Sequence, residues 1–145
     1  VQNQNGVMYD EGRTRISAAL DGECSRELRN TVSLQVRRND GAFFTSSTLS
    51  DLAVNSKLNN IRSDSIFYDP ACGTGDLLIS AAKLMPVENT LEKTLKEWGK
   101  KLIGSDINSI FIRAARSRIA LIAIERGAKT NNEKKLPLKK CAFQL

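Results

Sequence analysis

Apolar residues in the middle of the chain fall into short runs separated by longer helical repeats. The runs at 66–68 and 101–105 are typical of buried parallel strands. Around them, apolar residues recur every three or four positions, which indicates amphipathic helices. These repeats predict helices over 48–59, 76–84, 88–98 and from Ile107 to Gly127. Because strands alternate with helices, the pattern predicts an α/β fold with a doubly wound, mostly parallel sheet.

The last predicted helix carries two different faces. A polar face holds Ser109, Arg113 and Arg116, which we expect to meet solvent. The opposite face repeats at helical spacing and is expected to pack on the sheet. Its members are Ile107, Phe111, Ala115, Ile119 and Ile122.

Residues 1–40 differ from the rest of the chain and form an N-terminal extension that is partly helical. The first residues are rich in Gln, Asn and Gly without periodicity, and a short helix is expected within 13–30. A turn signal at Asn39-Asp40-Gly41 closes the extension. The α/β part follows over 41–145, with a Lys-rich surface loop and then a further strand expected at 141–145.

The composition restricts the class of protein. Hydrophobic residues make up 41% and charged residues 26%, which is typical of a globular domain. The absence of histidine excludes mechanisms that use imidazole as base, acid or metal ligand. Three widely spaced cysteines without a Cys-x-x-Cys pair predict neither a metal site nor a disulfide scaffold. No run is long enough to span a bilayer and no secretory signal is evident, so we expect a cytoplasmic protein.

The charge is unevenly distributed along the chain. The formal net charge is +6, and the whole surplus of basic residues lies after Asp40. A basic surplus of this kind favours a polyanionic partner such as nucleic acid.

Two glycines follow the first predicted strand, and an acidic residue follows the second. Gly73 and Gly75 allow a sharp turn and a close approach of backbone amides to a ligand. Asp106 stands where a carboxylate can accept both hydroxyls of a ribose. The third glycine of a dinucleotide loop is absent, and Asp76 places a negative charge where a pyrophosphate would bind. A carboxylate there suits a cation, and the adenosine ligand with an ammonium and a sulfonium group is S-adenosylmethionine.

Three segments together resemble a known family. Asp69-Pro70-Ala71-Cys72-Gly73-Thr74-Gly75 resembles the S-adenosylmethionine loop of the N6-adenine DNA methyltransferases, including the modification subunits of restriction systems. Gly41-Ala42-Phe43-Phe44-Thr45 is similar to the Phe-Tyr-Thr-Pro element of that family. Gly104-Ser105-Asp106-Ile107-Asn108 looks like its ribose-binding strand end. The resemblance covers 41 to about 127 and implies the front part of a class I, Rossmann-like methyltransferase domain.

The resemblance also implies roles for individual residues. Asp69 would orient the loop and meet the methionine ammonium, and Asp106 would hold the ribose. Ile107 would lie against the adenine. The remaining positions implied by the resemblance are Ala71, Cys72 and Gly73 in the loop and the methionine-contacting residues Phe43, Phe44 and Thr45. Gly75 and Asp76 are expected at the cofactor from their own conformational and charge properties, as described above.

The chain departs from the family pattern in three places. Ser46 stands where the family has a proline, and the gap of 37 residues from Asp69 to Asp106 is longer than the roughly 20 of a minimal unit. The catalytic Asn/Asp-Pro-Pro-Tyr/Phe element is missing, because Pro70, Pro86 and Pro137 are the only prolines and no two are adjacent. We therefore assign no catalytic residue to this chain. We expect that the methyltransferase domain is incomplete here and that the natural protein continues past Leu145.

The implied function is transfer of a methyl group to adenine N6 of DNA in a restriction-modification system, with a restriction or specificity subunit as a possible partner. Two alternatives remain open: methylation of RNA or of a protein glutamine, and a non-catalytic binding or assembly module. Simpler structural roles also remain open for single residues. Asp106 or the segment from Thr45 to Thr48 could cap a helix, and Asp76 could complement a helix dipole. A Phe43 or Phe44 ring could belong to the core, and Cys72 could be a small buried residue.

Overall fold

The computed structural model describes residues 45–130 as a continuous segment. It also describes Ser17, Ala19, Leu20, Glu27, Asn30, Ser33, Phe143 and Gln144. Several predicted segments lie outside the described residues. They are the aperiodic residues 1–12, Phe43 and Phe44, and the Lys-rich loop beyond residue 130. The backbone is helical at Ser17, Ala19 and Leu20, in agreement with the helix predicted within 13–30.

The described strands form one parallel sheet in the order β1-β2-β3. They are β1 (Phe67–Asp69), β2 (Leu102–Ser105) and β3 (Phe143–Gln144). The register pairs Tyr68 with Ile103 and Gly104 with Phe143. All three predicted strands are thereby confirmed. Since the strands are parallel, their carboxyl ends lie at one edge of the sheet, which is where ligands bind in open α/β folds.

The helices agree with the predicted ones in number and order over the continuous segment. They are α4 (Ser47–Asn55), followed by a short 3-10 turn (Leu58–Asn60), α5 (Asp76–Ala82), α6 (Leu91–Trp98) and α7 (Ser109–Glu125). Local signals account for their starts. The Thr90 hydroxyl accepts from the Lys93 amide at 3.3 Å, and the Asn108 side chain accepts from the Ile110 amide at 3.0 Å.

The start of α4 was predicted one residue too late. Ser46, in extended conformation, is the N-cap, and its hydroxyl accepts from the Leu49 amide at 3.3 Å. The predicted single helix over 48–59 is also divided, because regular α-helix ends at Asn55. Ser56 turns its hydroxyl back to the Ala53 carbonyl at 2.8 Å, which satisfies the last turn locally.

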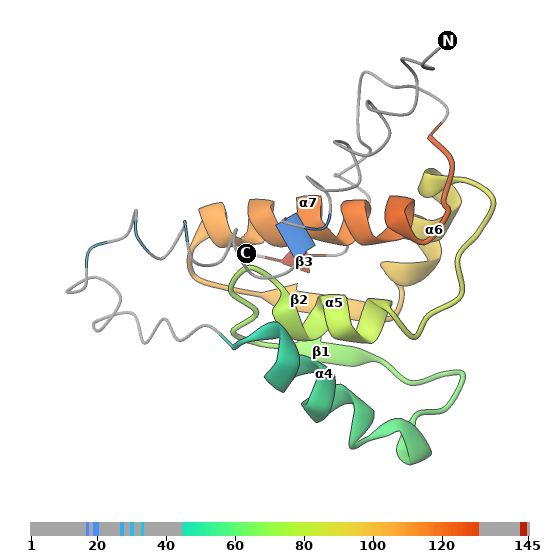
Figure 1. Cartoon of the computed structure of the whole chain (residues 1–145), viewed down its shortest axis with the longest axis horizontal. Coiled ribbons are helices and arrows are strands. Elements are labelled where there is room, and N and C mark those ends of the chain that lie inside the picture. Colours follow the sequence, from blue (N-terminus) through green and yellow to red (C-terminus); the bar gives the residue numbers. More distant parts are fainter. Residues whose placement is uncertain are drawn as a thin grey trace, which may run out of the picture.

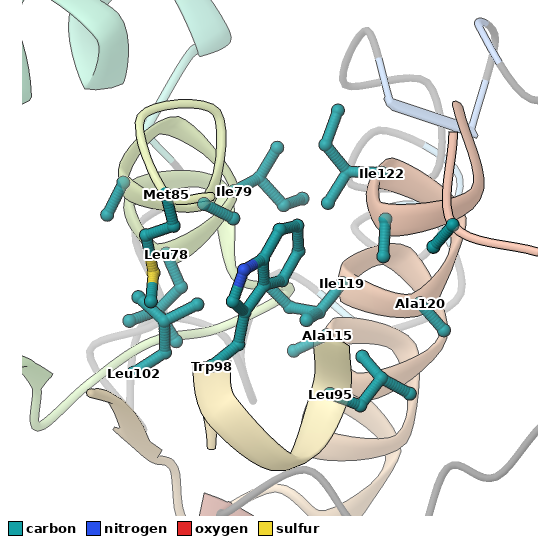
Figure 2. Close-up of a cluster of buried hydrophobic side chains, with 14 of the residues drawn as sticks. Leu78, Ile79, Met85, Leu95, Trp98, Leu102, Ala115, Ile119, Ala120 and Ile122 are labelled. Carbon is teal, nitrogen blue, oxygen red and sulfur yellow. The ribbon is translucent and has the colours of Figure 1, made fainter. Parts of the chain in front are cut away.

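One apolar core joins the sheet to α5, α6 and α7. Figure 2 shows the indole of Trp98, from α6, between apolar side chains of α5 and of α7. The indole Nε1 donates to the Pro86 carbonyl at 2.7 Å, so this buried ring has its polar atom satisfied. Leu102 of β2 and Ile119 of α7 are almost fully buried in the same cluster. The core therefore holds these three helices on one face of the sheet.

The other face of the sheet is more exposed. Phe67 and Leu102 point to the core, whereas their alternating neighbour Tyr68 is 62% exposed and Ile66 is 59% exposed. The prediction of strands buried on both faces was therefore wrong for β1. In the part of the chain that the structure describes, the sheet is covered on one side, so the doubly wound arrangement is not seen in full.

Helix α4 packs beside α5, away from α7 (Figure 1). Asp51 of α4 accepts from the Ser80 hydroxyl at 2.6 Å and pairs with Lys83 at 3.0 Å. These contacts hold the middle of α4 against the last turn of α5. None of the helices described here has the length and apolar character needed to cross a membrane.

Candidate functional site

The loop from Asp69 to Asp76 joins β1 to α5 at the carboxyl edge of the sheet. The Gly75 amide donates to the Cys72 carbonyl at 2.7 Å, and the Cys72 amide donates to the Ser105 carbonyl of β2 at 2.9 Å. Gly73 and Gly75 have φ angles of 52° and 87°, a region that residues with a β-carbon rarely adopt. The glycines predicted to shape this loop therefore do so.

Asp106 lies directly against this loop. One carboxylate oxygen accepts from the Gly73 amide at 2.9 Å, and the other accepts from the Asn108 amide at 2.8 Å. The structure thus brings together the two segments that the sequence analysis joined on chemical grounds. A carboxylate offers more acceptor sites than these two bonds use, so Asp106 retains capacity to accept from a ligand.

Asp69 ends β1 close to the same place. Its Oδ1 accepts from the Ala71 amide at 3.2 Å. Burial raises the pKa of Asp69 above its usual value, and the nearby Asp106 charge raises it further, against the opposing effect of the Ala71 hydrogen bond. The carboxylates of Asp69 and Asp106 together create a position where a cation is stabilised.

A small hollow with a cavity volume of about 40 Å³ opens beside the loop. It is well below the roughly 300–1,000 Å³ usual for small-molecule sites and holds only part of a ligand of that size. Six of the predicted cofactor-binding residues line it. They are Thr45, Asp69, Ala71, Cys72, Gly73 and Asp76, and the lining is completed by Thr74 and Leu77.

The other predicted site residues lie elsewhere or outside the description. Gly75 faces Ala115 of α7, where an added β-carbon would lie 3.0 Å from the Ala115 Cβ. Ile107 is 81% exposed at the entry to α7, just beyond Asp106. Phe43 and Phe44 lie outside the described residues.

Cys72 is a buried thiol in the loop. Burial raises its pKa to about 12, and the charges of Asp69 and Asp106 act in the same direction. The thiol is therefore protonated near neutral pH and is not a nucleophile. Within the described ranges, no three cysteine or acidic side chains gather as metal ligands would.

Arg118 is the site-related residue that the sequence analysis missed. Its side chain is buried, with 1% of the residue exposed, and its Nη2 pairs with Asp76 Oδ1 at 2.9 Å. The periodic pattern contained a signal for this, since Arg118 lies three residues after Ala115 and next to Ile119, within the apolar face. Of the arginines in this helix, the spacing pattern assigns only Arg113 and Arg116 to a face.

The Asp76 carboxylate consequently has a strong internal partner. It is 7% exposed, and its second oxygen accepts from the Thr74 hydroxyl at 3.2 Å. The negative charge that the sequence placed at the start of α5 is therefore balanced by Arg118. The negative charge at the loop therefore comes from Asp69 and Asp106.

Comparison with known proteins gave one result. The sequence model of the N-6 DNA methylase family matches residues 28–139 of the 145-residue chain. Neither the curated proteins nor the solved structures gave a significant match. The matched residues include the loop, Asp106 and Arg118, and the three parallel strands are compatible with part of a methyltransferase domain. The chain therefore belongs to the N-6 DNA methylase family.

Proposed function

We propose that this chain is the S-adenosylmethionine-binding part of a DNA methyltransferase that modifies adenine at N6. The family match supports the methyltransferase class and DNA methylation. The observation that carries the cofactor proposal is the 2.9 Å hydrogen bond between the Gly73 amide and the Asp106 carboxylate. It joins a glycine loop to an acidic strand end, as adenosine binding requires.

The chemistry of the hollow fits this cofactor. S-adenosylmethionine carries a positive sulfonium and an ammonium group, and Asp69 and Asp106 supply negative charge beside the loop. A triphosphate would suit the place poorly because both carboxylates would repel it. The two glycines keep the backbone close to the ligand position, and the hollow beside Thr45 is open.

The roles proposed for single residues follow from their positions. Asp69 would accept from the ammonium group and Asp106 from the ribose hydroxyls, with Ile107 against the adenine. Ala71, Cys72 and Gly73 would contact the cofactor through backbone atoms. Phe43, Phe44 and Thr45 would close over the methionine end. Gly75 would shape the turn, and Asp76, paired with Arg118, would line the cofactor site.

The cofactor, when bound, supplies a methyl group that is already activated for transfer. The contribution of this chain is then to bind and orient it, because a correctly placed donor removes much of the entropic cost of reaction. The target adenine has to leave the base stack to be reached. No residue of this chain is assigned to hold it, since the proline pair of the adenine-binding element is absent.

The proposed setting is a restriction-modification system in the cytoplasm. The basic surplus after Asp40 suits DNA as the partner, and an odd number of separated cysteines suits a reducing compartment. A restriction or specificity subunit of that system is the proposed protein partner.

Calorimetric titration with S-adenosylmethionine tests the cofactor proposal. Asp106→Asn keeps the shape but removes the charge, and we expect it to weaken binding by at least about tenfold, the effect of losing a hydrogen bond to a charged group. Asp64→Asn is the matched control, because Asp64 lies in an exposed pair with Arg62. Equal affinity in the Asp106 variant, or no binding by the unaltered chain, would contradict the proposal.

A further inference from the structure

Arg118 joins three separate parts of the molecule. Nη1 donates to the Thr74 carbonyl at 2.8 Å and lies 3.3 Å from the Thr74 hydroxyl, while Nη2 pairs with Asp76 at 2.9 Å. Nε donates to the Ala19 carbonyl at 2.8 Å, and Nη2 also reaches the Leu20 carbonyl at 3.3 Å. One side chain on α7 is thus bonded to the glycine loop, to the start of α5 and to a segment of the N-terminal extension.

The burial of this side chain gives these contacts their strength. A guanidinium removed from water is stable only when its charge and its N–H groups have partners. The planar fork of arginine can satisfy several acceptors at once in fixed directions, which lysine cannot do. The geometry of the loop at Thr74 is therefore tied to the position of Arg118.

The loop is held from two sides. Asp106 bonds to the Gly73 amide on one side, and Arg118 bonds to the next residue, Thr74, on the other. Helix α7 approaches closely here, since a β-carbon at Gly75 would come within 3.0 Å of Ala115, which lies one turn before Arg118. Little space is left for the loop to relax towards α7.

The segment at 19–20 is also attached to the core. Leu20 packs against the apolar cluster in addition to its carbonyl contact with Arg118. Ala19 and Leu20 are helical, and their carbonyl oxygens meet a positive charge, which stabilises such carbonyl groups. Docking of this segment and ordering of the loop therefore depend on the same side chain.

We propose that Arg118 is a positioning residue that holds the glycine loop in its cofactor-binding conformation and couples cofactor affinity to docking of the 19–20 segment. It acts through Thr74 and Asp76 and does not itself touch the ligand. This inference rests on the proposed function, because the affinity that it controls is that for S-adenosylmethionine.

The first test compares two arginine-to-lysine variants by titration with S-adenosylmethionine. Arg118→Lys keeps the charge beside Asp76 but cannot bond Thr74 and Ala19 together, and we expect at least about a tenfold loss of affinity. Arg126→Lys is the matched control. Arg126 follows α7 and donates to the carbonyls of Ala82, at the end of α5, and of Met85, just after it. The Arg126 variant therefore loses similar contacts at the opposite end of α5 from the loop. We expect unchanged affinity in that variant.

The second test needs no ligand. Hydrogen exchange of the free chain should rise in Arg118→Lys at 72–76 and at 19–20 together, and should stay unchanged at both places in Arg126→Lys. If Arg118→Lys does not fold, Thr74→Val serves instead, because it removes the hydroxyl between Arg118 and Asp76. That variant should also raise exchange at 19–20.

The outcomes separate the two proposals. If the unaltered chain fails to bind the cofactor, the proposed function fails, while the exchange measurement still decides whether Arg118 links the two segments. Unchanged exchange at 19–20 in the Arg118 and Thr74 variants would overturn the inference. Equal losses of affinity in the Arg118 and Arg126 variants would overturn it as well, since they would indicate general destabilisation.

Discussion

The Asp106 carboxylate accepts a hydrogen bond from the Gly73 amide at 2.9 Å, although the two residues are 33 positions apart in the chain. The bond connects the end of β2 to the loop after β1. Because these strands are neighbours and parallel, their carboxyl ends meet at one edge. The acidic character and the backbone turn that an adenosine cation requires are thus produced by the pairing of two short strands.

Gly75 is expected to be intolerant of a β-carbon for two reasons. Its φ of 87° costs about 1–2 kcal/mol for any other residue, and the new carbon would crowd Ala115 at 3.0 Å. Gly75→Ala should therefore lower the free energy of unfolding by more than this amount and weaken cofactor binding. Urea denaturation measures the first effect and calorimetry the second.

Gly127→Ala is the control for that substitution. Gly127 has a φ of 105°, but an added β-carbon would meet nothing within 4 Å. It should show the backbone cost alone, and no change in binding. If both glycine variants were equally stable, the close approach of α7 to the loop would be wrong.

Asp69 should make cofactor binding depend on pH. Its pKa is raised by burial and then by Asp106, so its proton is lost at a higher pH than usual for an aspartate. Affinity for a cation should fall as the pH decreases through this raised pKa, because the carboxyl group becomes neutral. Titrations between about pH 4 and 7 would measure the change, and Asp69→Asn should abolish that dependence and bind weakly throughout.

The same shift has the opposite effect on folding. An acid with a raised pKa in the folded state favours the protonated form, so its contribution to stability is full below the unfolded pKa and is lost as the pH rises through the folded value. Asp69→Asn should therefore unfold at a higher urea concentration than the unaltered chain at pH 7. A variant that is less stable and still binds the cofactor would contradict the assignment.

The Cys72 thiol should not react with alkylating reagents in the folded protein. With a pKa of about 12 and a buried position, its thiol has almost no reactive thiolate at neutral pH. Mass spectrometry after treatment with iodoacetamide should find Cys72 unmodified in buffer and modified in denaturant. Rapid labelling under native conditions would show that the loop opens to solvent.

The Arg118–Asp76 pair should contribute to stability in a strongly non-additive way. Breaking a buried pair by removing one partner costs about 3–5 kcal/mol, because a charge is left without compensation. Arg118→Met should show a loss of this order in urea denaturation. The double variant Arg118→Met/Asp76→Leu should lose less than the sum of the two single changes, since it leaves no buried charge.

An exposed ion pair supplies the comparison. Lys83 and Asp51 are 3.0 Å apart, but both side chains are more than a third exposed. Lys83→Met should change the free energy of unfolding by only about 0–1 kcal/mol. A loss as large as that in Arg118→Met would contradict the importance assigned to burial.

The sequence by itself determined the succession of strands and helices and the glycine loop. These features depend on local causes: apolar spacing, helix caps such as Asn108 and Thr90, and the conformational freedom of glycine. The acidic residue at the end of β2 could also be assigned in advance, because parallel pairing of neighbouring strands places their ends together. Six predicted cofactor-binding residues line one hollow, and five of them do so because they belong to the same loop, from Asp69 to Asp76.

Only the tertiary structure decided which charges are compensated and which faces are covered. Asp76 was predicted from its position to place a negative charge that suits a cation, and the structure supplies Arg118 of α7 as its partner. Tyr68 was predicted to be buried on sequence pattern, yet it is exposed because the packed helices lie on the other face of the sheet. Burial and charge pairing depend on which helices and strands pack together. The residues next to Asp76 or Tyr68 in the sequence therefore do not reveal which distant element will pack against them.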